Sequence, residues 1–186
     1  QIAQMYRLGT SKLHSDVILT GHQDMGTQQL INGTWSLFTM NTGDGMECIY
    51  EHDNDSIRYL ESYKGKILVT YNNYPLYNIF CNNTGSGVNG VGNWITPFIM
   101  HPDHDSTLLV GKAQVWRTTN GGLSFSQVGS VSGGSGNVGA LAYSSSDPQY
   151  IYAAKTNKVF VSTDGNTFND VTGILPVGSA SITAIV

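Results

Sequence analysis

Charged residues are scarce in this sequence, and what it lacks excludes several classes of protein. Asp, Glu, Lys and Arg make up 12% of the 186 residues, and the net charge is −4. With only nine Lys and Arg, the chain has no basic stripe that could follow a phosphate backbone. No apolar run approaches the roughly 18 residues that a membrane-spanning helix needs. We therefore expect neither nucleic-acid binding nor insertion into a membrane.

Cysteine is rare as well, and no segment has the periodicity of a helix. Cys48 and Cys81 are the only cysteines, which is too few for a disulfide framework. We place them on the first strand and just after the last strand of one predicted sheet. Strands about 4.8 Å apart put those two edges too far from each other for a bond. The sequence thus predicts two free thiols.

Two segments share a strand, a polar turn and an aromatic residue: residues 115–128 and 159–171. Asp and Asn side chains accept hydrogen bonds from backbone N–H groups just ahead of them, and Gly tolerates positive φ. We interpret both segments as β-hairpins whose turn residues have a structural role. These residues are Thr118, Asn120, Gly122, Ser124 and Phe125 in the first, and Ser162, Asp164, Gly165, Thr167 and Phe168 in the second.

The hairpins belong to a longer repeat, which residues 55–80, 105–128 and 147–171 share. The repeats start 50 and 42 residues apart, a spacing that suits four-stranded propeller blades. A short apolar strand precedes each of them (46–50, 94–100 and 138–143). These would be innermost strands, buried on both sides.

The sequence therefore predicts an all-β fold, a β-propeller segment of about four four-stranded blades. The predicted blades are residues 2–38, 45–80, 94–128 and 137–171, with 181–186 as the first strand of a further blade. Closed propellers have four to eight blades, so we expect part of a larger six- to eight-bladed ring. The alternative is a closed four-bladed ring that 181–186 completes. Because open sheet edges promote aggregation, the remainder of the propeller or a partner chain is expected to cover them.

The two hairpin turns resemble the Asp-box of bacterial-neuraminidase-repeat (BNR) and sortilin-like (VPS10-type) β-propellers, Ser-x-Asp-x-Gly-x-Thr-Trp/Phe. Asn120 stands where that pattern has Asp, and the second box keeps Asp164 but is one residue short before Phe168. In texture the chain is similar to large propeller-bearing exported proteins of Bacteroidota, which carry a type IX secretion signal at their far C-terminus. No such signal is present here. The resemblance implies a secreted or cell-surface protein.

Residues 21–27 (Gly-His-Gln-Asp-Met-Gly-Thr) and 43–45 (Gly-Asp-Gly) resemble segments of sortilin-like and xyloglucanase-type propellers, with a threonine before the second in place of a glycine. Glycoside hydrolysis needs two carboxylates roughly 5 to 9.5 Å apart, and Asp24, Asp44 and Glu47 are the candidates. An Asp flanked by Gly commonly caps its own turn instead, and we favour that structural interpretation.

The function that we expect is a non-catalytic extracellular module, a scaffold or a protein- or glycan-interaction domain of a larger secreted protein. The alternative is a glycoside hydrolase acting on a polysaccharide. Residues 101–105 (His-Pro-Asp-His-Asp) suggest a metal site, but 51–55 occupy the same place in the preceding repeat, which favours turn chemistry. We predict no metal and no cofactor.

Two Asp-Ser pairs have a further possible meaning. Ser56 and Ser106, followed by Ile and Thr, resemble the O-glycosylation sites of exported Bacteroidota proteins. The alternative is a turn that happens to use Asp and Ser. In a eukaryotic secretory context, the N-glycan acceptors would be Asn32, Asn54 and Asn82.

Overall fold

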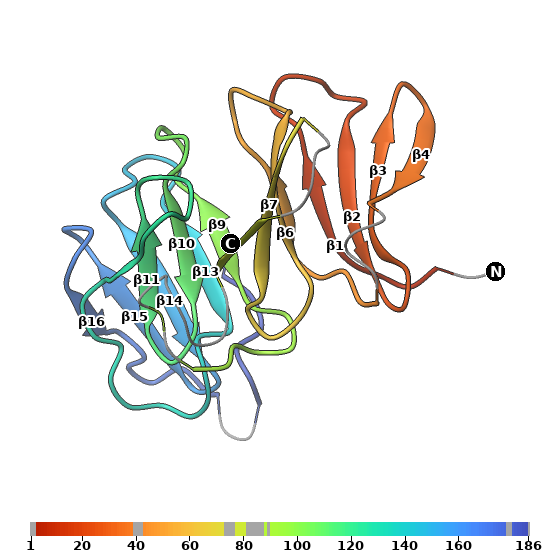
Figure 1. Ribbon diagram of the computed structural model, residues 1–186. Coiled ribbons are helices and arrows are strands. Elements are labelled where there is room, and N and C mark those ends of the chain that lie inside the picture. Colours follow the sequence, from red (N-terminus) through yellow and green to blue (C-terminus); the bar gives the residue numbers. More distant parts are fainter. Residues whose placement is uncertain are drawn as a thin grey trace. The chain divides into compact units, whose positions relative to one another are not determined.

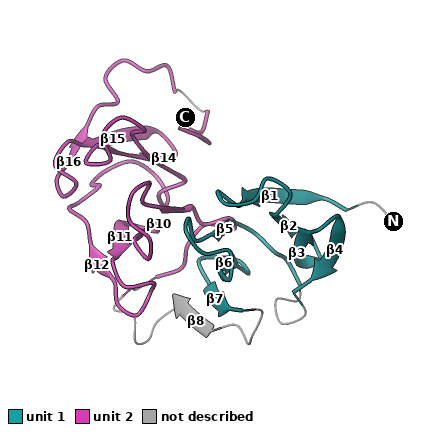
Figure 2. Ribbon diagram, turned by 90° about the horizontal axis from the view of Figure 1, so that it is seen from above, with its two compact units in different colours: residues 1–82 teal, residues 83–186 magenta. Residues whose placement is uncertain are grey.

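The computed structural model describes residues 3–38, 43–72, 88, 90–177 and 180–185, together with the backbone of one strand, β8 (Tyr77–Phe80). Within these ranges the chain forms four four-stranded antiparallel sheets and no helix, so none is present there to cross a membrane (Figure 1). The all-β prediction is confirmed. The chain divides into two compact units, residues 1–82 and 83–186 (Figure 2).

Unit 1 contains the first and second sheets. The first consists of β1 (Met5–Thr10), β2 (Ile18–His22), β3 (Gly26–Ile31) and β4 (Thr34–Leu37), and the second of β5 (Cys48–Tyr50), β6 (Ile57–Glu61), β7 (Ile67–Tyr71) and β8. Asn32 and Gly33 connect β3 to β4 with φ values of 50° and 73°. Positive φ at both positions is the type I′ turn that matches the twist of a hairpin, as the Asn-Gly pair predicts.

Unit 2 contains the third and fourth sheets. The third consists of β9 (Phe98–Met100), β10 (Leu108–Gly111), β11 (Val115–Thr118) and β12 (Ser126–Gln127), and the fourth of β13 (Ala140–Tyr143), β14 (Ile151–Lys155), β15 (Lys158–Ser162) and β16 (Phe168–Asp170). Every sheet runs in chain order, as a propeller blade does.

Each unit has a core between its two sheets. In unit 1, Leu19 of the first sheet clusters with Cys48 and Leu60 of the second. In unit 2, Leu109 of the third sheet clusters with Phe160 of the fourth. In each unit, we call the face of the later sheet that packs on the earlier sheet its upstream face, and the face of the earlier sheet that receives it a downstream face. The equivalent positions of the repeat define the upstream and downstream faces of the other sheets.

One prediction about the ends of elements is changed, and one remains a prediction. The inner strands are shorter than predicted: β9 begins at Phe98, not at residue 94, because Pro97 before it has no N–H to donate to a ladder. Residues 181–185 form no ladder with a described strand, although the Ile182 N–H donates to the Thr156 carbonyl. Their place in a further blade remains a prediction.

The thiol prediction concerns Cys48 and Cys81. Cys48 is a free, buried cysteine of β5. Burial raises the pKa of its thiol far above the ordinary range, so it is an inert apolar side chain. Cys81 lies outside the described residues.

Candidate functional site

The segment that carries Asp44 lies against the β2–β3 hairpin that carries Asp24. The Asp44 Oδ1 atom accepts a hydrogen bond from the Asp24 backbone N–H at 2.6 Å. The Gly26 N–H donates to the Gly43 carbonyl at 2.6 Å, and the Gly45 N–H donates to the His22 carbonyl at 2.9 Å. We call this set of contacts the backbone joint. It employs Asp44 as a cap and holds Asp24, at φ 57°, in the left-handed region.

Glu47 is mostly buried where the chain enters β5. Its Oε2 atom accepts a hydrogen bond from the Arg7 Nε atom at 3.2 Å, and 18% of its side chain is exposed. Burial raises the pKa of Glu47 above the ordinary value, and the charge of Arg7 opposes that shift. The carboxylate is thus paired across the two sheets of unit 1.

Replacing Glu47 by glutamine is expected to stabilise the protein at neutral pH. Because the folded-state pKa is raised, the charged form costs stability as the pH rises above the unfolded value of 4.5. Glutamine still accepts the bond from Arg7 but carries no charge. We expect the free energy of unfolding of the variant to exceed that of the wild type at pH 7 and to equal it at pH 4. Urea unfolding at both pH values measures this; a gain that persists at pH 4 would contradict it.

The turn between β15 and β16 is organised by Asp164. Its Oδ1 atom accepts hydrogen bonds from Thr167 N at 2.7 Å, Asn166 N at 2.8 Å and Ser162 Oγ at 3.0 Å. These bonds, that of Thr167 first, hold the pKa of Asp164 well below its ordinary range. Phe168 directly after the turn is buried in the core of unit 2.

The turn between β11 and β12 has the same arrangement around Asn120. Its Oδ1 atom accepts bonds from Thr118 Oγ1 at 2.9 Å and Ser124 N at 3.0 Å, and its Nδ2 atom donates to Ser124 Oγ at 2.9 Å. The Gly122 N–H donates to Thr118 Oγ1. Phe125 after the turn is half-buried.

These two turns predict a ranking of substitutions at residue 164. Asp164→Asn keeps an Oδ1 acceptor, as Asn120 does, whereas Asp164→Ala removes it. We therefore expect alanine to lower the melting temperature at pH 7 more than asparagine does. Because the folded-state pKa is depressed, the advantage of the wild type over the asparagine variant should shrink as the pH falls below 3.8. Calorimetry checks both; equal melting temperatures for alanine and asparagine would contradict the ranking.

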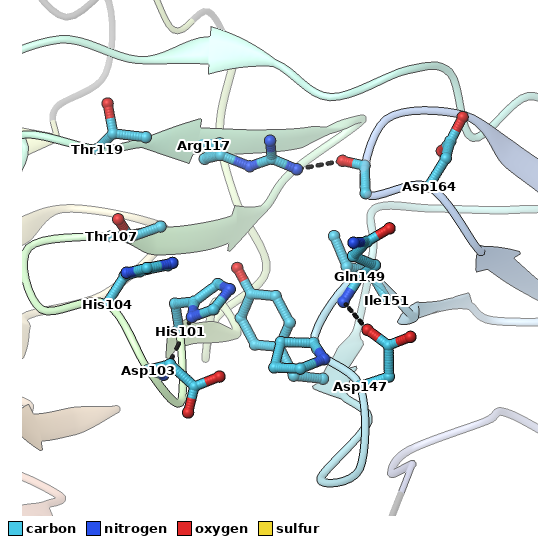
Figure 3. Close-up of a pocket in the computed structure, with 13 residues that line it drawn as sticks. His101, Asp103, His104, Thr107, Arg117, Thr119, Asp147, Gln149, Ile151 and Asp164 are labelled. Carbon is cyan, nitrogen blue, oxygen red and sulfur yellow. Dashed lines mark hydrogen bonds between the residues drawn. The ribbon is translucent and has the colours of Figure 1, made fainter.

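Unit 2 contains a pocket of about 410 Å³ at the end of the core between the third and fourth sheets (Figure 3). It opens where the turns after β9, β11, β13 and β15 meet. Its lining from the third sheet is His101, Asp103, His104, Thr107, Arg117 and Thr119, and from the fourth Tyr143, Asp147, Pro148, Gln149, Ile151, Asp164 and Gly165. We call it the turn pocket.

Three rings form one wall of the turn pocket. The centroids of the His101 and His104 rings lie 4.6 Å apart. Those of the His101 and Tyr143 rings lie 4.9 Å apart in a T-shaped arrangement. The His101 Nδ1 atom accepts a hydrogen bond from the Asp103 N–H at 3.1 Å, so in the neutral ring Nε2 carries the proton. The Tyr143 hydroxyl is buried and has no hydrogen-bond partner among the described residues, and burial raises its pKa.

Arg117 crosses the turn pocket from β11. Its guanidinium donates to the Gly165 carbonyl and lies 3.5 Å from the Asn166 side-chain oxygen, which joins the two sheets (Figure 3). The carboxylates of Asp103, Asp147 and Asp164 outnumber this one cation. A net negative lining disfavours anionic ligands.

The corresponding place in unit 1 has an arginine. Equivalent backbone hydrogen bonds close the first hairpin of the second sheet (Ile57 N to Asn54 O) and of the fourth (Tyr150 N to Asp147 O). When the two sheets are aligned on these bonds, Arg58 is equivalent to Ile151. The Arg58 guanidinium lies 5.6 Å and 5.5 Å from the centres of the Phe38 and Tyr50 rings. Unit 1 thus has an arginine near two aromatic rings at the position where unit 2 has Ile151, which lines the turn pocket.

The other predicted site residues lie at turns. His101 and Asp103 form a turn through their own hydrogen bond, and no group of three His, Cys, Asp or Glu in the described ranges is placed to hold a metal. Ser56 and Ser106 follow Asp55 and Asp105 in the β5–β6 and β9–β10 turns. The carbonyl of Ser106 accepts a bond from Gly121 N, and that of Ser56 one from Asn72 N.

Sequence reasoning singled out His101 and Asp103 but missed Arg117, Tyr143 and Gln149 as pocket residues. Arg117 alternates with Trp116 and Thr118 on β11, which places it on the downstream face of the third sheet. An arginine on a face that otherwise packs aliphatic residues is the signal that could have indicated the pocket.

No family model matches this chain, and no curated protein matches its sequence. Its fold does match solved structures. One is the crystal structure of an ancestral GH74 enzyme, with a TM-score of 0.71 and 17% sequence identity over 94% of this chain. The match spans 27% of the length of that enzyme. At this identity the likeness concerns the fold alone: an all-β, propeller-like chain.

Proposed function

We propose that this chain is a non-catalytic, extracellular propeller module of a larger secreted protein, and that it binds a glycan through the turn pocket. The observation that carries the non-catalytic part is the backbone joint. Asp44 caps the Asp24 backbone, and Glu47 is paired with Arg7, so two of the three candidate carboxylates have contacts that serve the fold. The hydrogen bonds of Asp164 and Asn120 support assigning their turns to the Asp-box, sortilin-like kind.

The lining of the turn pocket favours an uncharged sugar unit. A sugar hydroxyl both donates and accepts, and the lining offers a donor in Arg117 and acceptors in Asp103 and Asp147. The face of His104 offers a flat surface for the C–H side of a sugar ring. A volume of about 410 Å³ lies in the range that small ligands occupy.

Titration with uncharged mono- and disaccharides, followed by NMR, tests the binding role. We expect saturable shifts at unit 2 resonances with millimolar affinity, and at least about tenfold weaker binding for His104→Ala and Asp103→Asn. Leu123→Ser is the matched control, because Leu123 is exposed and lies outside the pocket lining. Binding that the pocket variants do not weaken would overturn the assignment.

Hydrolysis of a polysaccharide panel, xyloglucan included, tests the non-catalytic role. We expect no product from the wild type. The second candidate function, a glycoside hydrolase, is favoured by the fold likeness to a GH74 enzyme and by the raised pKa of Glu47, which suits a general acid. Product release that Asp24→Ala, Asp44→Ala or Glu47→Gln abolishes, with folding intact, would establish that candidate instead.

A further inference from the structure

The upstream face of the first sheet exposes large apolar side chains beside polar ones, although Thr20 and His22 on the same face are buried. Cross-strand pairing places Thr10, Ile18, Leu30 and Trp35 side by side on it. Leu8 is 56% exposed, Trp35 49% and Leu37 47%. None of the positions that cross-strand pairing places on this face is Asp, Glu, Lys or Arg: they are Met5, Leu8, Thr10, Ile18, Thr20, His22, Gly26, Gln28, Leu30, Trp35 and Leu37. Such a face is typical of a surface that another layer covers.

The corresponding face is covered in the later sheet of each unit. The same backbone hydrogen bond closes the turn between the first two strands of each sheet, from Val17 N to His14 O in the first sheet. When the repeats are aligned on this bond, Leu8 is equivalent to Cys48 and Leu141. Cys48 is fully buried and Leu141 is 8% exposed, whereas Leu8 is more than half exposed. The equivalent residues Cys48 and Leu141 are thus buried where another sheet packs on them, whereas Leu8 is exposed.

The outer strand gives the same result. The Phe38 N–H donates to the Thr27 carbonyl in the first sheet, and the Val171 N–H donates to the Val159 carbonyl in the fourth. When the two sheets are aligned on these equivalent bonds, Trp35 is equivalent to Phe168. Phe168 is 8% exposed and packs in the core between the third and fourth sheets, whereas Trp35 is half exposed. Trp35 therefore occupies a position that, in the fourth sheet, is buried between two sheets.

We propose that the upstream face of the first sheet takes the downstream face of a further four-stranded antiparallel sheet, carried by polypeptide that leads into β1. In both units an upstream face packs on the sheet that comes immediately before it in the chain. The face that receives it is aliphatic: Leu19 and Ile31 in the first sheet, Leu109 and Val115 in the third. The partner sheet carries aliphatic residues at these positions.

An extended chain tests this inference. A copy of residues 90–137, which contain the third sheet, is joined directly to Met5. In the alignment of Leu8 with Leu141, Met5 is equivalent to Val138, the residue that follows this segment in the chain. Trp94 and Trp116 are replaced by phenylalanine throughout, so that Trp35 is the only tryptophan. We expect a blue shift of its emission and about threefold weaker quenching by acrylamide than in the unextended chain. The control extension carries Leu109→Asp in the copy and should give neither change.

A pair of substitutions in the unextended chain adds an independent test. Leu8→Asp should leave the urea midpoint unchanged, whereas Leu141→Asp, at the covered equivalent position, should lower the folded-to-unfolded ratio by at least about a hundredfold. In the extended chain, Leu8→Asp should restore strong quenching of Trp35.

Three outcomes would overturn the inference. One is a Trp35 that quenches equally in both chains. Another is a Leu8→Asp variant that destabilises the unextended chain as much as Leu141→Asp does. The third is quenching of Trp35 that falls as the concentration of the unextended chain rises, because a second copy would then occupy the face.

Discussion

Gly21→Ala is expected to destabilise the protein by about 3 kcal/mol or more. A Cβ atom on Gly21 would overlap the Met46 carbonyl oxygen and lie 2.7 Å from the Gly45 carbonyl oxygen. Both obstacles are backbone atoms, which cannot rotate away as the end of a side chain can. The segment would have to leave β2, and the Gly45 hydrogen bond to the His22 carbonyl in the backbone joint would be lost with it.

Urea unfolding measures this loss, and Gly139→Ala is the matched control. A Cβ atom on Gly139 would have no neighbour closer than 3.6 Å, and the backbone there is not in the left-handed region. The control is expected to change the free energy of unfolding by no more than about 0.5 kcal/mol. If both variants unfold at the same urea concentration, the close approach of the joint to β2 is not rigid.

The effect at Gly21 also bears on what the glycine-rich motifs are for. Gly21 lies on β2, and Gly45 lies where a Cβ atom would overlap the Gly26 carbonyl. Small residues at both positions let two stretches of backbone come together without side chains between them. The motifs of residues 21–27 and 43–45 are therefore explained by close packing, before any catalytic role is invoked.

Much of the fold could be predicted because it depends on local signals. Alternating apolar residues mark the strands, and the turn chemistry of Asn32-Gly33 and of the Asp164 turn marks the hairpins between them. The predicted hairpin of residues 159–171 corresponds to β15 and β16. Strand limits are harder to predict: the apolar run of residues 94–100 suggested one strand, but β9 begins only at Phe98, after Pro97.

The site was harder to predict, since it depends on contacts between distant residues. The Asp44 cap is formed with a backbone group twenty residues away, and the sequence alone cannot distinguish such a cap from a catalytic carboxylate. The turn pocket joins Arg117 to Gly165 across two sheets. Which turns meet there depends on how the two sheets pack, and a motif within one hairpin does not predict the packing between sheets.

Phe160→Ala is expected to cost about 3 to 5 kcal/mol, because it empties the centre of the core of unit 2. Phe160 is 2% exposed and lies in one cluster with Leu109, Val115 and Ile151. Its cross-strand partner Ala153 is too small to fill the space that the ring would leave. The surrounding strands are hydrogen-bonded on both sides and cannot close the cavity, so both the transfer term and the cavity term apply.

The loss at Phe160 is best measured by urea unfolding followed through the unit 2 tryptophans, Trp94 and Trp116. Leu123→Ala provides the control: Leu123 is 79% exposed, and its truncation should change the free energy of unfolding by less than about 0.5 kcal/mol. Phe160→Leu, which fills part of the cavity, should lie between the two. Because the turn pocket opens at the end of the same core, sugar binding should weaken in proportion to the unfolded fraction. A Phe160→Ala protein as stable as the Leu123 control would mean that the third and fourth sheets are not held together by this core.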